Sequence, residues 1–313
     1  MRELRGLAAA AGVDAELWLK DDGRTAELWG GNKPRKLEWV LADVRRWRCR
    51  TIVTFGGLAT NHGLATALYA REHGMSCALA LVDQPVDSHV EAQLERIRGA
   101  GAHVHLTRSP ARTVLSIPGL VARYAQARPP RPPYLLPPGG SSPVGALGFV
   151  EAGLELAAQV EAGELPEPAA VVAALGSGGT AAGLVLGLRL GGLSRTRVLA
   201  VLVSDQVRLS ERTVLRLASR TRALLGRRGA RMNGVSLRRG DVEVPRGWLG
   251  GGYGHRTPEA DAAMVMANEA EGLRLDPVYT GKAVAALLGL ARDGALPAGP
   301  IVYWHTHSAV GEG

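Results

Sequence analysis

A lysine in the segment GGNKPRKLEW (residues 30–39) is the first candidate for covalent chemistry. Proline suits the first position of a helix, because its φ is helical and its missing N–H has no intrahelical partner there. Pro34 therefore predicts a helix start, with Asn32 near the cap and Lys33 at the loop-to-helix junction. Free N–H groups at that end disfavour an ammonium ion and should lower the pKa of Lys33. Such an amine can form a Schiff base, although this segment by itself favours an ordinary solvated lysine.

A second segment, TFGGLATNHGLATA (residues 54–67), predicts a strand, a glycine turn and a helix that begins near Thr60 and Asn61. Free N–H groups at a helix start can bind an anion such as a substrate carboxylate. Thr60 and Asn61 are also ordinary helix caps, so this pattern by itself leaves both interpretations open.

A third segment, AALGSGGTAAGL (residues 173–184), again predicts a strand, a glycine-rich turn and a helix. Glycines allow the backbone to approach an anion closely, and Ser177 and Thr180 add hydroxyl donors, which favours phosphate binding. The spacing also fits the loose dinucleotide pattern G-x-G-x-x-A, with Asp205 after the next strand, so a nicotinamide-dependent enzyme is an alternative. No lysine follows the glycines, which excludes a nucleotide P-loop.

Polar residues near the C-terminus form a fourth group: Tyr253 in GGYGH, Tyr279 and Thr280 in DPVYTGKA, and Thr306 in YWHTHS. Tyrosines in glycine-rich loops can serve as acid–base groups or form the rim of a pocket, and their spacing does not decide between these roles.

Two histidine pairs, at positions 103 and 105 and at positions 305 and 307, each share one face of a predicted strand, as two metal ligands could. The sequence offers no evident third ligand to either pair. We therefore predict no metal site.

The elements around these motifs alternate between strand and helix. Apolar runs predict strands at residues 51–55, 77–82, 103–106, 134–137, 169–175, 198–203 and 300–304. Apolar residues three or four apart predict helices at 37–47, 61–72, 88–99, 146–160 and 180–190, with Ser88 and Glu91 as a capping box. Alternation of this kind is typical of an α/β fold with mostly parallel sheets.

Length and composition fit a globular protein of two domains, with 313 residues, 46% hydrophobic and 21% charged. No apolar run approaches the roughly 18 residues of a membrane span. Two cysteines and no signal-peptide pattern lead us to expect a cytoplasmic protein. The net charge of +8 comes almost wholly from arginine spread along the chain, and the densest stretch, residues 220–231, is typical of a solvated helix face. We therefore expect no nucleic-acid partner.

Taken together, the motifs resemble the family of D-cysteine desulfhydrases and aminocyclopropane-carboxylate deaminases, which are pyridoxal-phosphate enzymes of fold type II, similar to the tryptophan synthase β subunit. The resemblance extends from about residue 17 to residue 308 and includes LWLKDD, GGNKPRKLEWVLAD, TFGGLATNHGLATA, LLPPGGSSPVGALGFVEAGLEL, GSGGTAAGL, GGYG, LDPVYTGKA and YWHT. It implies a small lobe at 44–148 and a large lobe made of 1–43 and 149–313. We expect the proline-rich stretch 127–140 to be a structured crossover between the lobes.

The same resemblance implies a set of site residues. Lys33 would carry the cofactor, with Lys36 as a structural neighbour, and Asn61 would bond its phenolic oxygen. The loop at 176–180 would hold the phosphate, and the segment 60–62 would receive the substrate. The predicted residues are, for catalysis, Lys33, Thr60, Tyr253 and Tyr279; for the cofactor, Lys33, Asn61, Ser177, Gly178, Gly179, Thr180, Thr280 and Thr306; and for the substrate, Thr60, Asn61 and His62.

Two threonines bear on the activity. Within the family, desulfhydrases have threonine at the positions of Thr280 and Thr306, whereas deaminases have glutamate and leucine. The resemblance therefore implies β-elimination of D-cysteine to pyruvate, ammonia and hydrogen sulfide, with a neutral hydroxyl near the cofactor's ring nitrogen, in a homodimer. The alternatives are deamination of aminocyclopropane-carboxylate, elimination or replacement on another β-substituted amino acid, and cofactor binding without catalysis.

This chain departs from the family at two places that bear on the substrate. Ala59 and Thr60 stand where the family usually has glutamine and serine, so the amide at position 59 is lost. The family's HTGG is here HTHS, so that His307 and Ser308 replace two glycines.

Overall fold

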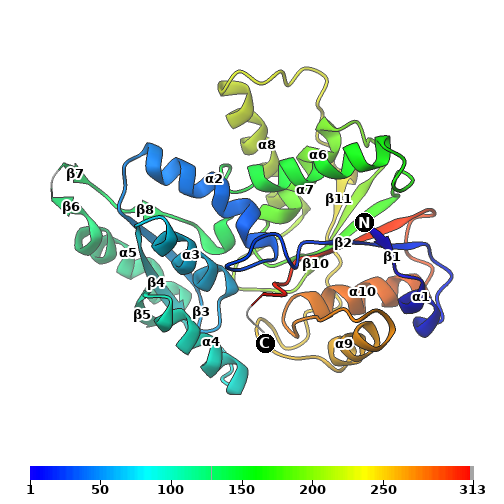
Figure 1. Cartoon of the computed structure of the whole chain (residues 1–313), viewed down its shortest axis with the longest axis horizontal. Helices are drawn as coiled ribbons and strands as arrows, with labels where there is room; N and C mark the ends of the chain where they lie inside the picture. The colour runs from blue at the N-terminus through cyan, green and yellow to red at the C-terminus, as the bar shows by residue number, and fades with distance from the viewer. Residues whose placement is uncertain (128, 311–313) are drawn as a thin grey trace.

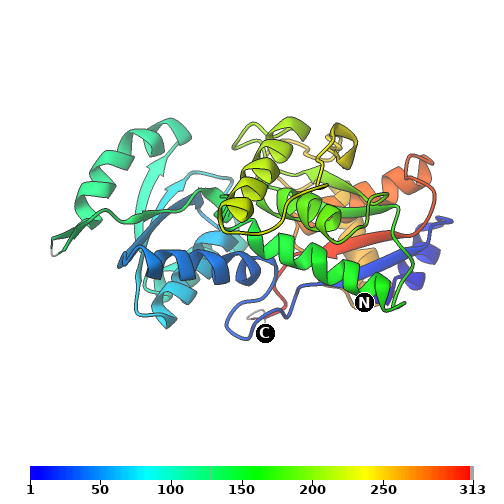
Figure 2. The same ribbon diagram turned by 90° about the horizontal axis from the view of Figure 1, so that it is seen from above.

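Two parallel β-sheets, each covered by helices, form the two ends of the protein in its computed structural model (Figures 1 and 2). The structure describes residues 1–127 and 129–310; residue 128 of the proline-rich stretch and residues 311–313 of the expected large lobe lie outside the described residues. The α/β class predicted from the alternation of strands and helices is confirmed.

The larger sheet has the strand order β1-β2-β12-β9-β10-β11. All of its neighbouring pairs are parallel except β1 with β2. Apolar side chains on both faces of β9, β10 and β12 are buried, as expected for strands with helices on either side. The strands are β1 (Arg2–Glu3), β2 (Leu17–Asp21), β9 (Ala170–Leu175), β10 (Arg197–Leu202), β11 (Val242–Glu243) and β12 (Ile301–His305).

The smaller sheet is wholly parallel and has the order β5-β4-β3-β8. Its strands are β3 (Thr51–Gly57), β4 (Ser76–Val82), β5 (His103–Arg108) and β8 (Tyr134–Leu135). The proline-rich stretch is ordered as predicted over its described residues: a short hairpin of β6 (Gln126–Ala127) and β7 (Pro130–Arg131) leads into β8 and then into the 3-10 turn η1 (Pro138–Gly140).

Helices cover both faces of each sheet. On the large sheet α6, α7 and α8 pack on one face, and α1, α9 and α10 pack on the other. On the small sheet α2, α3 and α4 share one face, and α5 packs on the opposite one. The helices are α1 (Arg5–Ala11), α2 (Asn32–Arg46), α3 (Asn61–Glu72), α4 (Ser88–Gly99), α5 (Pro110–Tyr124), α6 (Leu147–Glu161), α7 (Gly179–Leu190), α8 (Glu211–Arg227), α9 (Pro258–Glu271) and α10 (Thr280–Arg292), with a 3-10 turn η2 (Arg239–Asp241).

One predicted helix start is wrong by two residues, and one predicted helix cap is wrong by one residue. Helix α2 begins at Asn32 rather than Pro34, because Gly31, at a φ of 77° that favours glycine, already turns the chain into the helix. Helix α4 has no capping box at Ser88, because the carboxylate of Asp87 caps it one residue earlier by accepting the Val90 N–H at 2.9 Å.

The arginine-rich stretch 220–231 is helical only in part. Helix α8 ends at Arg227, and residues 228–231 follow it as a turn and loop. Within the described part of the chain, no helix is both long enough and apolar enough to cross a membrane.

The packing of α6 against α7 predicts a strict requirement for glycine at position 183. A Cβ there would lie 2.4 Å from Phe149 Cβ and 2.5 Å from the Ala146 oxygen. Gly183→Ala should therefore lower the free energy of unfolding by about 1–3 kcal/mol, although alanine is the better helix former. Gly119→Ala, on exposed helix α5 with no atom within 4 Å, should raise it by about 0.5–1 kcal/mol. Thermal melts of both variants check this, and a stable Gly183→Ala protein would contradict it.

Candidate active site

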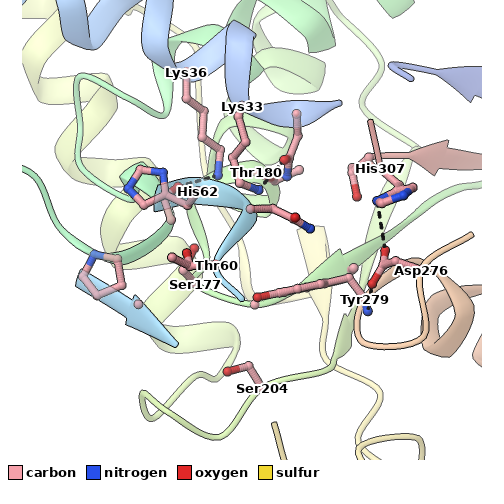
Figure 3. A pocket seen from close by; sticks show the side chains of 18 of the residues that line it. Lys33, Lys36, Thr60, His62, Ser177, Thr180, Ser204, Asp276, Tyr279 and His307 are labelled. Atoms are coloured by element: carbon pink, nitrogen blue, oxygen red, sulfur yellow. Dashed lines mark hydrogen bonds and ion pairs between the residues drawn. The ribbon is translucent and has the colours of Figure 1, made fainter. Parts of the chain in front are cut away.

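A pocket lies between the two sheets, at the carboxyl ends of β3, β9, β10 and β12 (Figure 3). Ligands commonly bind at this edge of parallel sheets. Most of the predicted site residues line it: Lys33, Thr60, Asn61, His62, Ser177, Gly178, Thr180, Tyr253, Tyr279 and Thr306. Gly179 and Thr280, the first residues of α7 and α10, are not among the residues that line the pocket.

Lys33 enters the pocket from the second residue of α2. Its Nζ donates a hydrogen bond to the side-chain oxygen of Asn32, whose amide nitrogen donates to Thr180 Oγ1 at 3.2 Å. Asn32 thus links the lysine to the start of α7. Burial lowers the pKa of Lys33 to about 8, and the nearby carboxylate of Asp276 opposes that shift. A substantial share of this amine is neutral at mildly alkaline pH.

Lys36 lies one helical turn further along α2 and points into the same pocket (Figure 3). It is 3% exposed, and its Nζ donates to the backbone oxygen of Gly139 at 3.1 Å. Burial, and then the charge of Lys33, hold its pKa well below the usual value. No carboxylate lies within salt-bridge distance of Lys36 among the described residues. Its charge is therefore available to a bound anion.

The glycine-rich turn before α7 faces Lys36. Gly178 caps the helix without any side-chain hydrogen bond. The Gly179 N–H donates to Ser141 Oγ at 2.9 Å, and that hydroxyl donates to Ser177 Oγ at 2.8 Å. A Cβ on Gly179 would lie 3.2 Å from Lys36 Nζ, so the lysine is close to the helix start. A helix N-terminus, hydroxyl groups and an ammonium ion together form a site for a phosphate.

The start of α3 forms the opposite wall. Thr60 caps the helix, as predicted, with its Oγ1 accepting the Gly63 N–H at 3.1 Å. Asn61 Oδ1 accepts from the buried amide of Gln93 at 2.7 Å, which leaves the Asn61 amide nitrogen as a donor.

His62 is held between two threonines and remains a neutral imidazole. Thr54 Oγ1 donates to the Leu136 oxygen at 2.9 Å, so it accepts from His62 Nε2, 3.0 Å away. Thr66 Oγ1 lies 3.5 Å from Nδ1. Burial, and then the charges of Lys33 and Lys36, keep the pKa of His62 well below its usual value.

Two tyrosines form a hydroxyl pair on the pocket wall. Tyr279 Oη donates to Tyr253 Oη at 3.0 Å, and the two rings meet edge to face. Burial raises the pKa of Tyr253, and it raises that of Tyr279 well above its usual value. Both remain protonated, and the Tyr253 proton is free to point to a different acceptor.

Asp276 is a buried carboxylate on the pocket wall that the sequence motifs did not single out. Its oxygens accept the N–H groups of Val278, Tyr279 and Thr280, and Thr280 Oγ1 donates to it at 2.6 Å. His307 Nδ1 lies 3.7 Å from Oδ2 (Figure 3). Burial raises the pKa of Asp276, but His307, Thr280 and the backbone donors outweigh it and lower the net value. The Thr280 hydroxyl is thus bonded to a carboxylate.

The C-terminal loop closes on the turn before Lys33. The Gly30 N–H donates to Ser308 Oγ at 2.9 Å, and the Asn32 N–H donates to the Thr306 oxygen at 3.1 Å. Ser308 and His307, which replace the family's two glycines, therefore make contacts at the site: the first to the lysine turn, and the second to Asp276.

The sequence profile of the family described as "Pyridoxal-phosphate dependent enzyme" matches residues 1–307. The chain belongs to this family. Pyridoxal phosphate is therefore its cofactor, and the dinucleotide interpretation of the loop at 176–181 is wrong. A glycine-rich turn before a helix suits the phosphate of either cofactor, so the sequence pattern alone could not separate the two interpretations.

The enzyme also resembles individual pyridoxal-phosphate enzymes. It is 34% identical over 300 residues to a D-cysteine desulfhydrase of Klebsiella pneumoniae (strain 342), covering 94% of this chain and 87% of the relative. It is 35% identical over 304 residues to a D-cysteine desulfhydrase of Yersinia enterocolitica, with the same coverage. The crystal structure of an ACC deaminase homologue superposes with a TM-score of 0.82 at 29% identity, covering 99% of this chain and 89% of the homologue. The fold predicted from the resemblance is confirmed.

The residues of the pocket fit pyridoxal phosphate. A cofactor of this kind needs an amine for its aldehyde and cationic or N–H donors for its phosphate. The pocket supplies a lysine of lowered pKa, and a second buried lysine without a carboxylate partner beside the α7 N-terminus. Gly178 and Ser177 leave that helix start open to the pocket.

Sequence reasoning gave no role at the site to four residues that lie in or beside the pocket. Asn32 and Lys36 flank the predicted lysine in the same motif, and their residue types alone carried the available signal. Ser141 and Asp276 lie in the quoted segments LLPPGGSSPVG and LDPVYTGKA. Their importance depends on contacts with residues 36 and 31 positions away in the chain, which local spacing does not reveal.

The lowered pKa of Lys33 predicts a pH dependence for reconstitution of the apoenzyme. Only the neutral amine attacks the cofactor aldehyde, so the initial rate should rise about tenfold per pH unit and level off near pH 8. Stopped-flow absorbance from about pH 6 to about pH 10 measures this rate. Nα-acetyl-lysine, whose side-chain amine is free, provides the control amine. Lys33→Ala should lack the rapid absorbance change that the wild type gives. A rate that rises steadily to about pH 10 would show an ordinary lysine.

Proposed function

We propose that the enzyme is a lyase that eliminates sulfide from D-cysteine, consuming water and releasing pyruvate, ammonia and hydrogen sulfide. The observation that carries the proposal is the half-buried amine of Lys33, of lowered pKa, in one pocket with a helix start suited to phosphate and a pair of protonated tyrosines. The two relatives named as D-cysteine desulfhydrases support the choice of substrate.

The cofactor would be held at both ends by residues of this chain. Lys33 would bond covalently to it, and the Asn61 amide nitrogen would donate to its phenolic oxygen. The turn formed by Ser177, Gly178, Gly179 and Thr180 would receive its phosphate. Lys36 would supply the positive charge, since its Nζ lies at the same helix start. When bound, pyridoxal phosphate supplies an aldehyde that condenses with amines and a ring that withdraws electrons from the substrate α-carbon.

The substrate carboxylate would bind at the start of α3. Thr60 Oγ1 accepts a capping hydrogen bond, which leaves its own proton to donate, and the first N–H groups of the helix add to it. His62 lies beneath this position as a neutral group, so it shapes the wall without repelling an ammonium group. Together Thr60, Asn61 and His62 would orient the amino acid.

Lys33 would move the reacting proton. With a pKa of about 8, a large share of the Lys33 amine is neutral at mildly alkaline pH, and this neutral amine is a base that can take the Cα proton. Asn32 accepts a hydrogen bond from Lys33 Nζ and donates one to Thr180, so it would hold the amine near the start of α7.

Tyr253 would protonate the leaving sulfur as the Cβ–S bond breaks. Tyr279 donates to Tyr253, which orients the Tyr253 proton toward the pocket, and the raised pKa values keep both hydroxyls protonated. Thr280 and Thr306 would stand near the cofactor ring. The Thr280 hydroxyl donates to the Asp276 carboxylate and accepts the Asp276 N–H at 2.7 Å, so only one lone pair is left for a further partner.

A second candidate activity is deamination of aminocyclopropane-carboxylate, which the solved ACC deaminase homologue favours. Both reactions require the same lysine and the same carboxylate site. Elimination or replacement on another β-substituted amino acid is a third possibility within the same chemistry.

We also propose that the chain divides into a small lobe at 44–148 and a large lobe formed by 1–43 and 149–313, with the pocket between them. The separate hydrophobic cores of the two sheets support this division, although α2 crosses residue 44 and packs on the small sheet. The enzyme would act in the cytoplasm as a homodimer, without a nucleic-acid or membrane partner.

Incubation of the purified holoenzyme with D-cysteine should release pyruvate and sulfide in equal amounts, and Lys33→Ala should lower kcat by at least about 10³-fold, because it loses the base. L-cysteine, β-chloroalanine and aminocyclopropane-carboxylate are the comparison substrates. 2-Oxobutyrate from aminocyclopropane-carboxylate, without sulfide from D-cysteine, would favour the deaminase. Cofactor absorbance without turnover of any of these substrates would favour cofactor binding alone.

Lys36 should govern cofactor affinity. Lys36→Met keeps the length of the side chain but removes a charge-assisted hydrogen bond, which is worth about 1.5–3 kcal/mol. The Kd for pyridoxal phosphate should rise by about tenfold to a hundredfold in a fluorescence titration. Arg45→Met, which removes a positive charge from the exposed side of the same helix, is the matched control. An unchanged Kd in Lys36→Met would refute the phosphate role.

A further inference from the structure

Lys282 is a buried lysine that the proposed chemistry does not use. It lies in the first turn of α10, shortly after Tyr279, and it is 0% exposed. Its Nζ donates to the backbone oxygen of Leu249 at 2.7 Å and to that of Gly252 at 3.3 Å. These carbonyls belong to the loop of residues 249–254, which carries Tyr253.

Asp205 holds the same loop from the other side. It follows β10, and its Oδ1 accepts the Tyr253 N–H at 3.0 Å. Gly252 has a φ of 122°, and a Cβ there would lie 3.0 Å from Asp205 Oδ2. A side chain at position 252 would therefore strain the backbone and push the loop away from the carboxylate.

Lys282 and Asp205 carry opposite charges and bind opposite kinds of backbone group in the 249–254 loop. A buried ammonium ion is costly unless it is well bonded, and here two carbonyls accept from it. Burial lowers the pKa of Lys282, while Asp205 and Asp276 act against that shift. The carbonyls of the loop thus face a cation from α10, and its N–H faces an anion from the β10 loop.

We propose that Lys282 and Asp205 are positioning residues that clamp the 249–254 loop and so set the contact between Tyr253 and Tyr279. Helix α10 carries Tyr279 as its N-terminal cap residue and reaches the Tyr253 loop through Lys282. One helix start therefore fixes both hydroxyls, which meet at 3.0 Å. This inference rests on the proposed function in that Tyr253 acts in the reaction.

Hydrogen exchange of the holoenzyme tests the clamp without reference to activity. Lys282→Met and Asp205→Ala should each speed exchange in the peptide containing residues 249–254 by at least tenfold. Asp205→Asn keeps an oxygen acceptor for the Tyr253 N–H and should exchange within about threefold of the wild type. Asp205 is exposed, so its variants should fold even if Lys282→Met does not. Unchanged exchange in Asp205→Ala would overturn the proposal.

A double-mutant cycle tests the positioning role. Lys282→Met should lower kcat at least tenfold in the wild-type background and less than twofold in Tyr253→Phe, because the clamp then has no hydroxyl to place. Lys282→Arg should recover part of the loss, since it can still donate to both carbonyls. Equal losses in the two backgrounds would mean a general structural effect and would overturn the proposal.

The loop clamp and the catalytic role of Tyr253 can be refuted separately. Full kcat in Tyr253→Phe would refute the role of Tyr253 in the proposed function, whatever the exchange rates show. Fast exchange in Asp205→Ala together with a non-additive cycle would support the clamp. Slow exchange in Asp205→Ala with an impaired Tyr253→Phe enzyme would retain the catalytic tyrosine and refute the clamp alone.

Discussion

The ion pair between the buried carboxylate of Asp22 and Arg35 is the interaction on which the geometry of the site depends. Asp22 is 0% exposed and binds Arg35 through both oxygens, at 2.8 and 3.0 Å. Trp304, on the central strand β12, donates to it at 2.8 Å, and the Asp22 backbone oxygen accepts the Gly31 N–H. Arg35 lies between Lys33 and Lys36 on α2. The network therefore ties the helix that carries both lysines to the large sheet, while its apolar stripe packs on the small one.

The sequence predicted the central strands and the helices that follow them because their apolar patterns are strong. The run at 169–175 is apolar throughout and became β9, and the run at 51–55 consists wholly of β-branched and aromatic residues and became β3. Helices α1, α5, α9 and α10 were not predicted. Helix α5 contains Pro118, which normally argues against a helix interior.

The site was predictable where a short motif carries the chemistry, as with Lys33 and the glycine-rich turn. It was not predictable where chemistry depends on distant contacts. Asp276 lies next to His307, and Asn32 donates a hydrogen bond to Thr180, and both partners are far away in the sequence. The lost amide at position 59 is a further example: Gln84 Oε1 accepts the Ala59 N–H at 3.1 Å, so an amide from the end of β4 reaches this loop.

Placing two lysines in one buried pocket links folding to cofactor supply. In the free protein, burial and the charge of Lys33 hold the pKa of Lys36 down, so the unfolded chain binds protons more strongly. The free protein should thus lose stability as the pH falls below lysine's usual range. A phosphate that restores the charge of Lys36 reverses this loss, and the stabilisation grows with the logarithm of cofactor concentration. When the cofactor is scarce, the chain would then lose conformational stability together with its activity.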